Sequence, residues 1–262
     1  MPSDWLPFTR VHFVPIQDDV VRSADDDIRD QIGKAYHSLE RDYGFVTWRD
    51  VKFMARGGDP RALSILELCG QRLRLFESPQ HMKAKLAVVL SEVAKPGPTL
   101  VLARFRDTAR FLESSLSAMQ SNIVRADGSM KRSEIGFATS QFRSFDTTNK
   151  GALVITRELG GRGLDFPSAA RVVIASPRSN YQAVAQELAR IRSRQQKPKV
   201  AVITYFANTE EQAKALRLAD HLAAEKFGPS ALFDVRDTPS DTYRLEPFER
   251  RTLMYEESLA AR

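Results

Sequence analysis

The sequence has few of the features that mark secreted, membrane or zinc-binding proteins. Only one of its 262 residues is a cysteine, Cys69, so no internal disulfide can form. No apolar run approaches the roughly 20 residues that cross a bilayer, and residues 1–10 lack the layout of a signal peptide. The four histidines show no paired ligand spacing. These absences exclude a disulfide scaffold, a membrane protein and a zinc enzyme, and we expect a soluble, intracellular protein without a metal site of its own.

Positive charge is concentrated in the middle of the chain. The formal net charge is +6, but residues 1–50 carry −4, residues 51–200 carry +13 and residues 201–262 carry −3. A basic section between acidic flanks is typical of a protein that binds a polyanion, such as nucleic acid or nucleotide phosphates. A solvated surface with an excess of arginine gives the same counts, so charge alone does not identify the partner.

Hydrophobic spacing divides the chain into a mainly helical part and a part in which strands and helices alternate. Before residue 94 it predicts one short strand and then three helices, at about 11–16, 24–43, 60–76 and 81–93. From residue 99 strands and helices alternate, which predicts an α/β fold of βαβ units with a parallel three-layer sheet. The expected strands are about 99–103, 122–125, 152–155, 171–175 and 200–205, and the expected helices about 106–119, 131–142, 181–194 and 209–226.

Parallel sheets bind their ligands at the carboxyl ends of strands, which makes the residues just after 103, 155 and 175 the candidates for a site. Thr156 ends one expected strand, and a glycine-rich loop, residues 160–163, follows soon after. The threonine hydroxyl and the free backbone N–H groups of such a loop can bind a phosphate. Either feature alone is equally consistent with an ordinary strand residue or a simple turn.

Charged side chains follow the same loop. Asp165 can accept a hydrogen bond from a ribose hydroxyl or orient an arginine. Arg190, Arg192 and Arg194 offer planar donors that suit phosphate oxygens. Arginines two positions apart on a helix point to different sides, so at least one of the three can be merely solvated.

Taken in order and spacing, these segments resemble the second RecA-like lobe of superfamily 2 helicases and translocases. The resemblance covers about residues 80–226, and its segments are 100–105 (motif IV), 127–130 (the turn before motif IVa), 141–143, Thr156 with 163–167 (motif V), 186–192 (motif VI) and 208–211. The Gly-Leu-Asp-Phe-Pro sequence and the Gln-x-x-x-Arg-x-Arg sequence about 20 residues later are its most specific parts. Motif VI is most similar to the Dicer and viral-RNA-sensor branch, and 208–211 to the related archaeal Hef group.

In that family the second lobe closes on ATP, which the first lobe holds together with Mg²⁺. The resemblance implies that Arg190 and Arg192 reach the γ-phosphate as arginine fingers. The other residues that it implies at the nucleotide are Gly163, Asp165, Gln186 and Arg194. Ala189 replaces the usual motif VI glycine and Ser193 stands where many relatives keep the last arginine, so which arginine is the finger stays open.

The resemblance also implies contacts to nucleic acid, either DNA or RNA. The residues that it places at the nucleic-acid backbone are Arg104, Phe105, Thr156 and Arg157. Phosphate contacts of this kind make binding salt-sensitive and largely independent of base sequence.

The sequence lacks the Gly-x-x-x-x-Gly-Lys-Ser/Thr loop and the Asp-Glu box with which a first lobe binds Mg-ATP. We therefore expect the C-terminal half of an ATP-dependent helicase, which hydrolyses ATP only with a first RecA-like lobe or a separate ATPase subunit. The expected division is an interlobe connection with a helical insertion (1–79), the RecA-like domain (80–228) and a helical C-terminal extension (229–262).

Two other interpretations stay open. The first is a non-catalytic RecA-like module that binds nucleic acid or protein, with motif VI altered because ATPase activity was lost. The second is an unrelated Rossmann-like enzyme that binds a nucleotide or a sugar.

Overall fold

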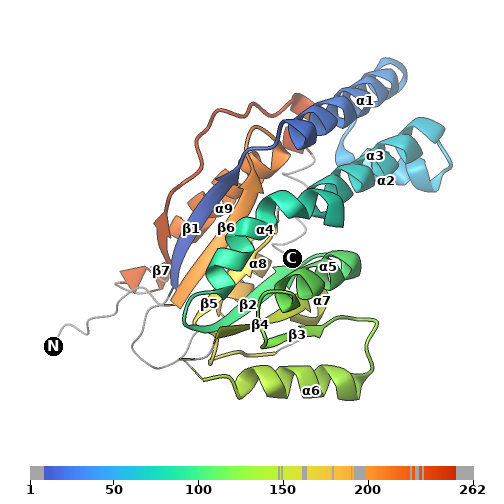
Figure 1. The fold of residues 1–262 in the computed structure, drawn as a ribbon. Helices are drawn as coiled ribbons and strands as arrows, with labels where there is room; N and C mark the ends of the chain where they lie inside the picture. The colour runs from blue at the N-terminus through green and yellow to red at the C-terminus, as the bar shows by residue number, and fades with distance from the viewer. Residues whose placement is uncertain are drawn as a thin grey trace.

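The centre of the protein is a sheet of seven parallel strands. The computed structural model describes residues 9–146, 148, 150–160, 164–178, 180–189, 191, 199–224, 226–227, 230–231 and 233–251. The strands are β1 (Thr9–Ile16), β2 (Gly97–Ala103), β3 (Ile123–Ala126), β4 (Lys150–Thr156), β5 (Arg171–Ile174), β6 (Lys199–Phe206) and β9 (Phe233–Arg236). They lie in the order β3-β4-β2-β5-β6-β1-β9 (Figure 1). A separate antiparallel pair consists of β7 (Lys226–Phe227) and β8 (Ser230–Ala231).

Helices cover both faces of this sheet, and the predicted three-layer α/β fold is confirmed. One face is covered by α4 (Pro79–Val93) and α5 (Arg106–Ser117), and the other by α6 (Arg132–Arg143), α8 (Tyr181–Ala189) and α9 (Glu210–Ala224). The alternation within β2 shows how the strands serve both layers, since Leu100 and Leu102 enter one core while Val101 and Ala103 enter the other. Strands buried on both faces are why the sequence shows continuous apolar runs. A short helix, α7 (Arg157–Gly160), follows β4 directly.

Three helices form an arm that projects from the sheet. Helix α1 (Asp19–Tyr43) leads away from it, α2 (Trp48–Arg56) lies at the far end and α3 (Pro60–Glu77) returns (Figure 1). Each begins at a side-chain cap, since Asp18, Thr47 and Asp59 accept hydrogen bonds from the N–H groups of the first turns. The arm has an apolar core of its own, against which Cys69 packs half-buried.

A buried arginine ties the arm to the sheet and to the C-terminal segment. Arg72 on α3 donates from Nε to Asp25 Oδ1 at 2.5 Å, from Nη1 to Glu249 Oε1 at 2.6 Å and from Nη2 to the Tyr243 hydroxyl at 3.0 Å. Its Nε also lies 3.7 Å from Glu210 Oε2 on α9. Burial alone disfavours the charge, but Glu210 and Asp25 outweigh it and hold the pKa of Arg72 well above its usual value. These five residues are called the Arg72 cluster below.

The place of β1 is the main addition to the sequence-based prediction. The strand expected at about 11–16 lies inside the sheet, paired along its whole length with β6 and over four residues with β9. The division of the chain at residues 79 and 228 stays a prediction, and the sheet includes strands from both sides of these positions. Helix α2 and strand β9 were not expected, because nine and four residues give too little periodicity. Of the expected helical C-terminal extension, the structure describes residues 230–231 and 233–251, of which 247–251 are helical.

No helix in the described part of the chain is long and apolar enough to cross a membrane.

Candidate functional site

The carboxyl ends of three adjacent strands bring polar residues together. Strands β2 and β4 pair in register up to Ala103 and Thr156, so the residues that follow them, Arg104 and Arg157, leave the sheet side by side. On the other side of β2, Leu102 pairs with Ile174 of β5. The segments after residues 103, 155 and 175, which the sequence singled out, therefore meet at one edge. This is the edge at which parallel sheets bind ligands.

Arg104 and Phe105 lie at the end of β2, next to the base of the arm. The Arg104 backbone N–H donates to Glu77 Oε2 at 2.8 Å, and its Nε lies 3.2 Å from Glu77 Oε1. The arginine side chain keeps 21% of its surface exposed. Phe105 is half-buried, with the guanidinium carbon of Arg74 5.3 Å from its ring centroid. Both residues can reach a ligand at the edge without unfolding any element.

Thr156 and Arg157, at the end of β4, are buried, and each is 2% exposed. Arg157 Nη2 donates to the carbonyl of Ser176 at 2.7 Å, and its Nε lies 3.8 Å from Glu187 Oε2. Thr156 Oγ1 and the Nε and Nη1 of Arg157 have no hydrogen-bond partner within the described residues. Buried polar atoms without partners are costly, so this end of β4 holds unused hydrogen-bonding capacity. The role of both residues at nucleic acid stays a prediction.

A buried ion pair that the sequence did not reveal contacts the segment after β5, at the carboxyl edge of the sheet. Lys85 Nζ of α4 lies 2.7 Å from Glu211 Oε2 of α9, and donates to the Ala175 carbonyl at 2.8 Å and to Ser176 Oγ at 3.0 Å. Burial lowers the pKa of Lys85 and raises the pKa of Glu211. The signal in the sequence is a lysine on the apolar face of α4, between Met82 and Val89.

Arg178, in the loop after β5, is a further residue that the sequence analysis did not select. Its Nη1 lies 3.4 Å from Glu187 Oε1 and its side chain is 26% exposed. Burial and the neighbouring Arg157 lower the pKa of Arg178 to about 10. Arg104, Arg157 and Arg178 thus place three guanidinium groups after three neighbouring strands. Planar donors in such a set suit phosphate oxygens.

The residues expected at the nucleotide are described only in part. Asp165 is exposed, and its backbone carbonyl accepts a hydrogen bond from Arg143 Nη2 at 3.2 Å. Gln186 is exposed on α8. Gly163, Arg190, Arg192 and Arg194 lie outside the described residues. The roles of Asp165 and Gln186 at a nucleotide stay predictions. In the described ranges no group of three His, Cys, Asp or Glu could hold a metal ion.

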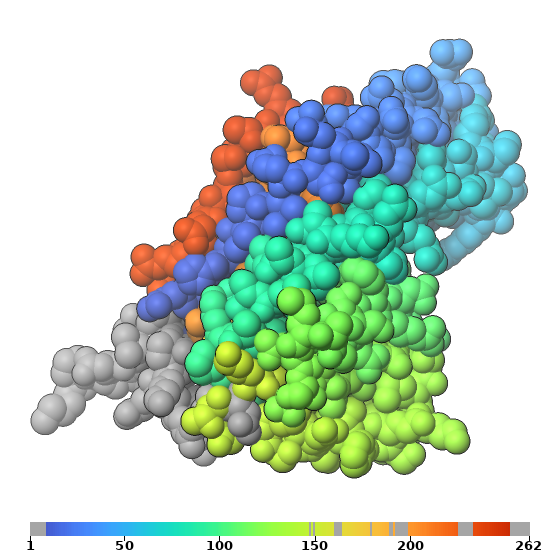
Figure 2. Space-filling view, in the orientation of Figure 1, coloured from blue at the N-terminus to red at the C-terminus, as the bar shows by residue number. Residues whose placement is uncertain are grey.

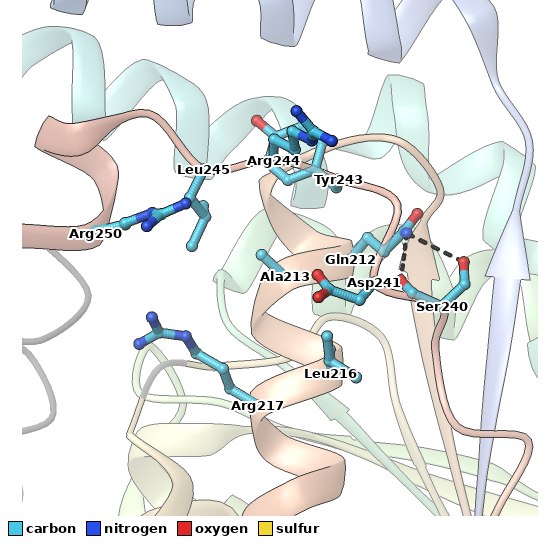
Figure 3. Close-up of a pocket in the computed structure, with 10 residues that line it drawn as sticks. All are labelled: Gln212, Ala213, Leu216, Arg217, Ser240, Asp241, Tyr243, Arg244, Leu245 and Arg250. Carbon is cyan, nitrogen blue, oxygen red and sulfur yellow. Dashed lines mark hydrogen bonds between the residues drawn. The ribbon is translucent and has the colours of Figure 1, made fainter.

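A hollow of about 530 Å³ lies apart from these residues, between α9 and the segment 240–250. Figure 3 shows its two walls, which Gln212 joins by donating to the Ser240 carbonyl at 2.7 Å. The same amide donates to Thr242 Oγ1 at 2.8 Å. None of the described site residues lines this hollow.

Comparison with known proteins finds a match to a family model for the central part of the chain. Residues 82–195 match the model of the helicase conserved C-terminal domain. The DNA repair protein rad5 of Neurospora crassa is 26% identical over 149 residues, which are 56% of this chain and 12% of that protein. The chain therefore spans about an eighth of the length of this curated relative.

Solved structures show the same fold. The C-terminal part of the Fun30 ATPase domain superposes with a TM-score of 0.52 at 13% identity, covering 86% of this chain and 92% of that one. The SWI2/SNF2 ATPase core of Sulfolobus solfataricus in complex with dsDNA gives 0.54 at 13% identity, covering 82% of this chain and 44% of that one. At this identity the likeness is one of architecture.

Proposed function

We propose, from the premise that residues 82–195 form a helicase C-terminal domain, that this chain supplies the second RecA-like lobe of an ATP-dependent nucleic-acid helicase or translocase. In this role it contacts the nucleic-acid backbone at the carboxyl edge of its sheet and completes the ATP site of a first lobe. The first lobe supplies the phosphate-binding loop and the Mg²⁺ ligands.

The observation that carries the proposal is the meeting of Arg104, Arg157 and Arg178 at one sheet edge, after three adjacent strands. Arg104 is partly exposed, and Thr156 and Arg157 keep hydrogen-bonding atoms without partners in the described structure. A phosphate oxygen is an acceptor that can use guanidinium and hydroxyl donors together. The edge thus has the chemistry that a phosphate backbone requires.

The motif VI arginines are the residues proposed to contact ATP. Arg190 and Arg192 are the proposed fingers, and Gly163, Asp165, Gln186 and Arg194 are the proposed nucleotide contacts. The exposure of Asp165 and Gln186 supports this, because a first lobe can reach both side chains. An arginine finger neutralises the charge that develops on the transferring phosphoryl group.

DNA is the nucleic acid that we propose first. The rad5 relative is named as a DNA repair protein, and the Sulfolobus ATPase core was solved with dsDNA. The similarity of motif VI to the Dicer and viral-RNA-sensor branch would favour RNA instead, and its arginines lie outside the described residues. A direct comparison of DNA and RNA as ligands decides between the two.

The catalytic test joins this chain to an ATP-binding first lobe, within one polypeptide or as a separate subunit. We expect nucleic-acid-stimulated ATP hydrolysis, and Arg190→Ala should lower its rate about a thousandfold or more. Arg192→Ala, measured in parallel, identifies which arginine is the finger. Lys83→Ala, at an exposed position of α4, is the control that keeps the rate. Undiminished turnover in both arginine variants would contradict the finger assignment.

The binding test titrates single- and double-stranded DNA and RNA at two salt concentrations. Affinity should fall with added salt, and Arg104→Ala should weaken every ligand to a similar extent, because it contacts phosphate and not bases. Salt-sensitive binding without ATP hydrolysis in the joined protein would favour the non-catalytic module. Absence of binding to all four ligands would remove the nucleic-acid role.

A further inference from the structure

The outer face of α2, at the far end of the arm, carries three cations around an exposed phenylalanine. Arg49, Lys52, Phe53 and Arg56 are spaced i, i+3, i+4 and i+7, so they lie on one side of the helix. Phe53 is 76% exposed. Arg49 and Arg56 are exposed and form no ion pair with any residue that the structure describes. These four residues are called the α2 stripe.

The opposite face of α2 fixes the stripe in place. Trp48, Val51 and Ala55 are buried in the core of the arm. A capping box at Thr47 and Asp50 holds the first turn, with the Thr47 N–H donating to Asp50 Oδ2 at 2.9 Å. The stripe is therefore presented by an anchored helix and not by a loop, and Lys52 within it lies over the ring of Trp48, 5.7 Å from the ring centroid.

The field around the stripe is positive because nearby acidic groups are already engaged. Asp42 and Asp59 both pair with Arg61. Asp50 accepts hydrogen bonds from the N–H and the hydroxyl of Thr47, which hold the pKa of this carboxyl below its usual value. Asp50 also attracts Arg49, but the three cations of the stripe outnumber this one neighbouring carboxylate, so the stripe is suited to a polyanion.

The exposed ring narrows the class of polyanion. A duplex presents phosphates on its outside and keeps its bases stacked, so it offers nothing to an aromatic side chain on a convex helix. An unpaired strand offers phosphates to cations and base faces to a ring, and this pairing of contacts is how proteins bind single strands. The seven steps along the helix from Arg49 to Arg56 rise about 10 Å, roughly the axial length of three nucleotides.

The stripe lies on the side of the molecule where the strands end. Helix α1 follows the carboxyl end of β1, and α3 returns to Glu77, which contacts Arg104. Figures 1 and 2 show the arm extending outward from this edge. A nucleic-acid strand that leaves its proposed phosphate contacts at the sheet edge can therefore follow the arm toward α2.

We propose that the α2 stripe binds an unpaired nucleic-acid strand, with Arg49 and Arg56 on phosphates and the Phe53 ring stacked on a base. The proposal deepens the proposed function, on which it rests for the presence of nucleic acid at the sheet edge. The stripe adds a second, strand-selective contact to the backbone contacts of Arg104.

The test measures the affinity of the full chain for an oligothymidylate and for a duplex of equal length by fluorescence anisotropy. Phe53→Ala should weaken single-strand binding about 5- to 100-fold, the range for loss of one stacked base, and leave the duplex affinity nearly unchanged. Arg49→Ala with Arg56→Ala should reduce the salt dependence of single-strand binding by about 1.4 in log–log slope.

Matched controls come from the rest of the surface. Phe137 on α6 is 72% exposed, so Phe137→Ala removes an equally exposed ring elsewhere and should leave binding unchanged. Lys34→Ala with Lys83→Ala removes two exposed charges from α1 and α4 and should leave the slope unchanged. Circular dichroism of all variants checks that the helices are retained.

The outcomes separate this inference from the proposed function. If Arg104→Ala weakens binding while the stripe variants bind like the wild type, the inference is overturned and the proposed function stands. If the wild type binds no nucleic acid at all, both fail. If the arginine variants weaken binding but Phe53→Ala does not, the stripe contacts phosphate only and the unpaired-strand proposal is overturned.

Discussion

The Arg72 cluster and the carboxyl edge of the sheet are both buried groups of charged side chains, but they differ in how completely their hydrogen bonds are made. Every guanidinium nitrogen of Arg72 donates to a carboxylate or a phenol. At the edge, Thr156 Oγ1, two nitrogens of Arg157 and Glu187 Oε2 have no hydrogen-bond partner in the described structure. A satisfied cluster holds elements together, whereas an unsatisfied one keeps capacity for a ligand.

The same contrast separates structural from functional charge in this chain. The Arg72 cluster joins α1, α3, α9 and the C-terminal segment, which is a mechanical role. The edge group lies after β2, β4 and β5, where a phosphate backbone is proposed. Mutations in the Arg72 cluster should therefore lower the stability of the protein. Mutations that remove the unpaired atoms at the sheet edge should weaken ligand binding and change stability little.

The largest expected effect is that of Arg72→Ala. The change leaves the buried carboxylate of Asp25 without its cation and leaves Glu249 with Arg29 alone, and breaking a buried pair from one side costs about 3–5 kcal/mol. Urea unfolding followed by circular dichroism measures the loss. Arg22→Ala, which removes an exposed arginine paired with Asp19, should cost about 0.5 kcal/mol or less. A similar small loss in Arg72→Ala would erase the contrast between the two groups.

Lys85→Met should destabilise the protein in a pH-dependent way. Burial already raises the pKa of Glu211 above its usual value, and removal of Lys85 raises it further. The folded variant then keeps a proton that the unfolded chain releases, so its stability falls as pH rises from the usual pKa of Glu211 toward the raised one. Near neutral pH we expect a loss of about 3 kcal/mol, smaller in mild acid.

Urea titrations of Lys85→Met at two pH values, one mildly acidic and one mildly alkaline, check this slope. Lys83→Met, on the exposed side of the same helix, is the control and should change stability by about 0.5 kcal/mol or less at both. A Lys85→Met variant that is more stable on the alkaline side would show that Glu211 is not the group left unpaired.

The smallest effect comes from a matched pair of threonines. Thr204 Oγ1 on β6 donates to the Ala175 carbonyl at 2.8 Å, and both Thr204 and Thr156 are buried. Thr204→Val should therefore cost about 1 kcal/mol. Thr156→Val removes a hydroxyl that has no described partner, and should leave stability unchanged or slightly raised while weakening nucleic-acid binding. Equal losses of stability in the two variants would show that the Thr156 hydroxyl is satisfied in the folded protein.

The sequence predicts the sheet well because its central strands are buried on both faces. Residues 99–103 and 152–155 are apolar without interruption, and alternation with helices implies parallel pairing. The ligand rule for such sheets then leads to Arg104 and Thr156 without any structure. The match of residues 82–195 to the helicase C-terminal domain confirms the resemblance in its coarser form, and the roles of Arg104 and Thr156 stay predictions.

The rest depends on distant partners that local pattern does not encode. The pairing of β1 with β6 joins residues 190 positions apart, from Thr9 to Lys199. Lys85 and Arg157 are charged types that usually lie outside, and their burial follows from Glu211, Ser176 and Glu187. The α2 stripe has ordinary surface composition, and only the position of α2 at the end of the arm suggests that it binds a ligand.

The placement of β1 between β6 and β9 has a consequence for biosynthesis. The 182 residues from 17 to 198 must be made before the first partner of β1 exists, which at 5–20 residues per second takes about 10–40 s on the ribosome. During that time β1 is an unpaired strand with two open edges, the kind of segment that aggregates or pairs wrongly. We therefore expect closure of this one long-range contact to slow folding.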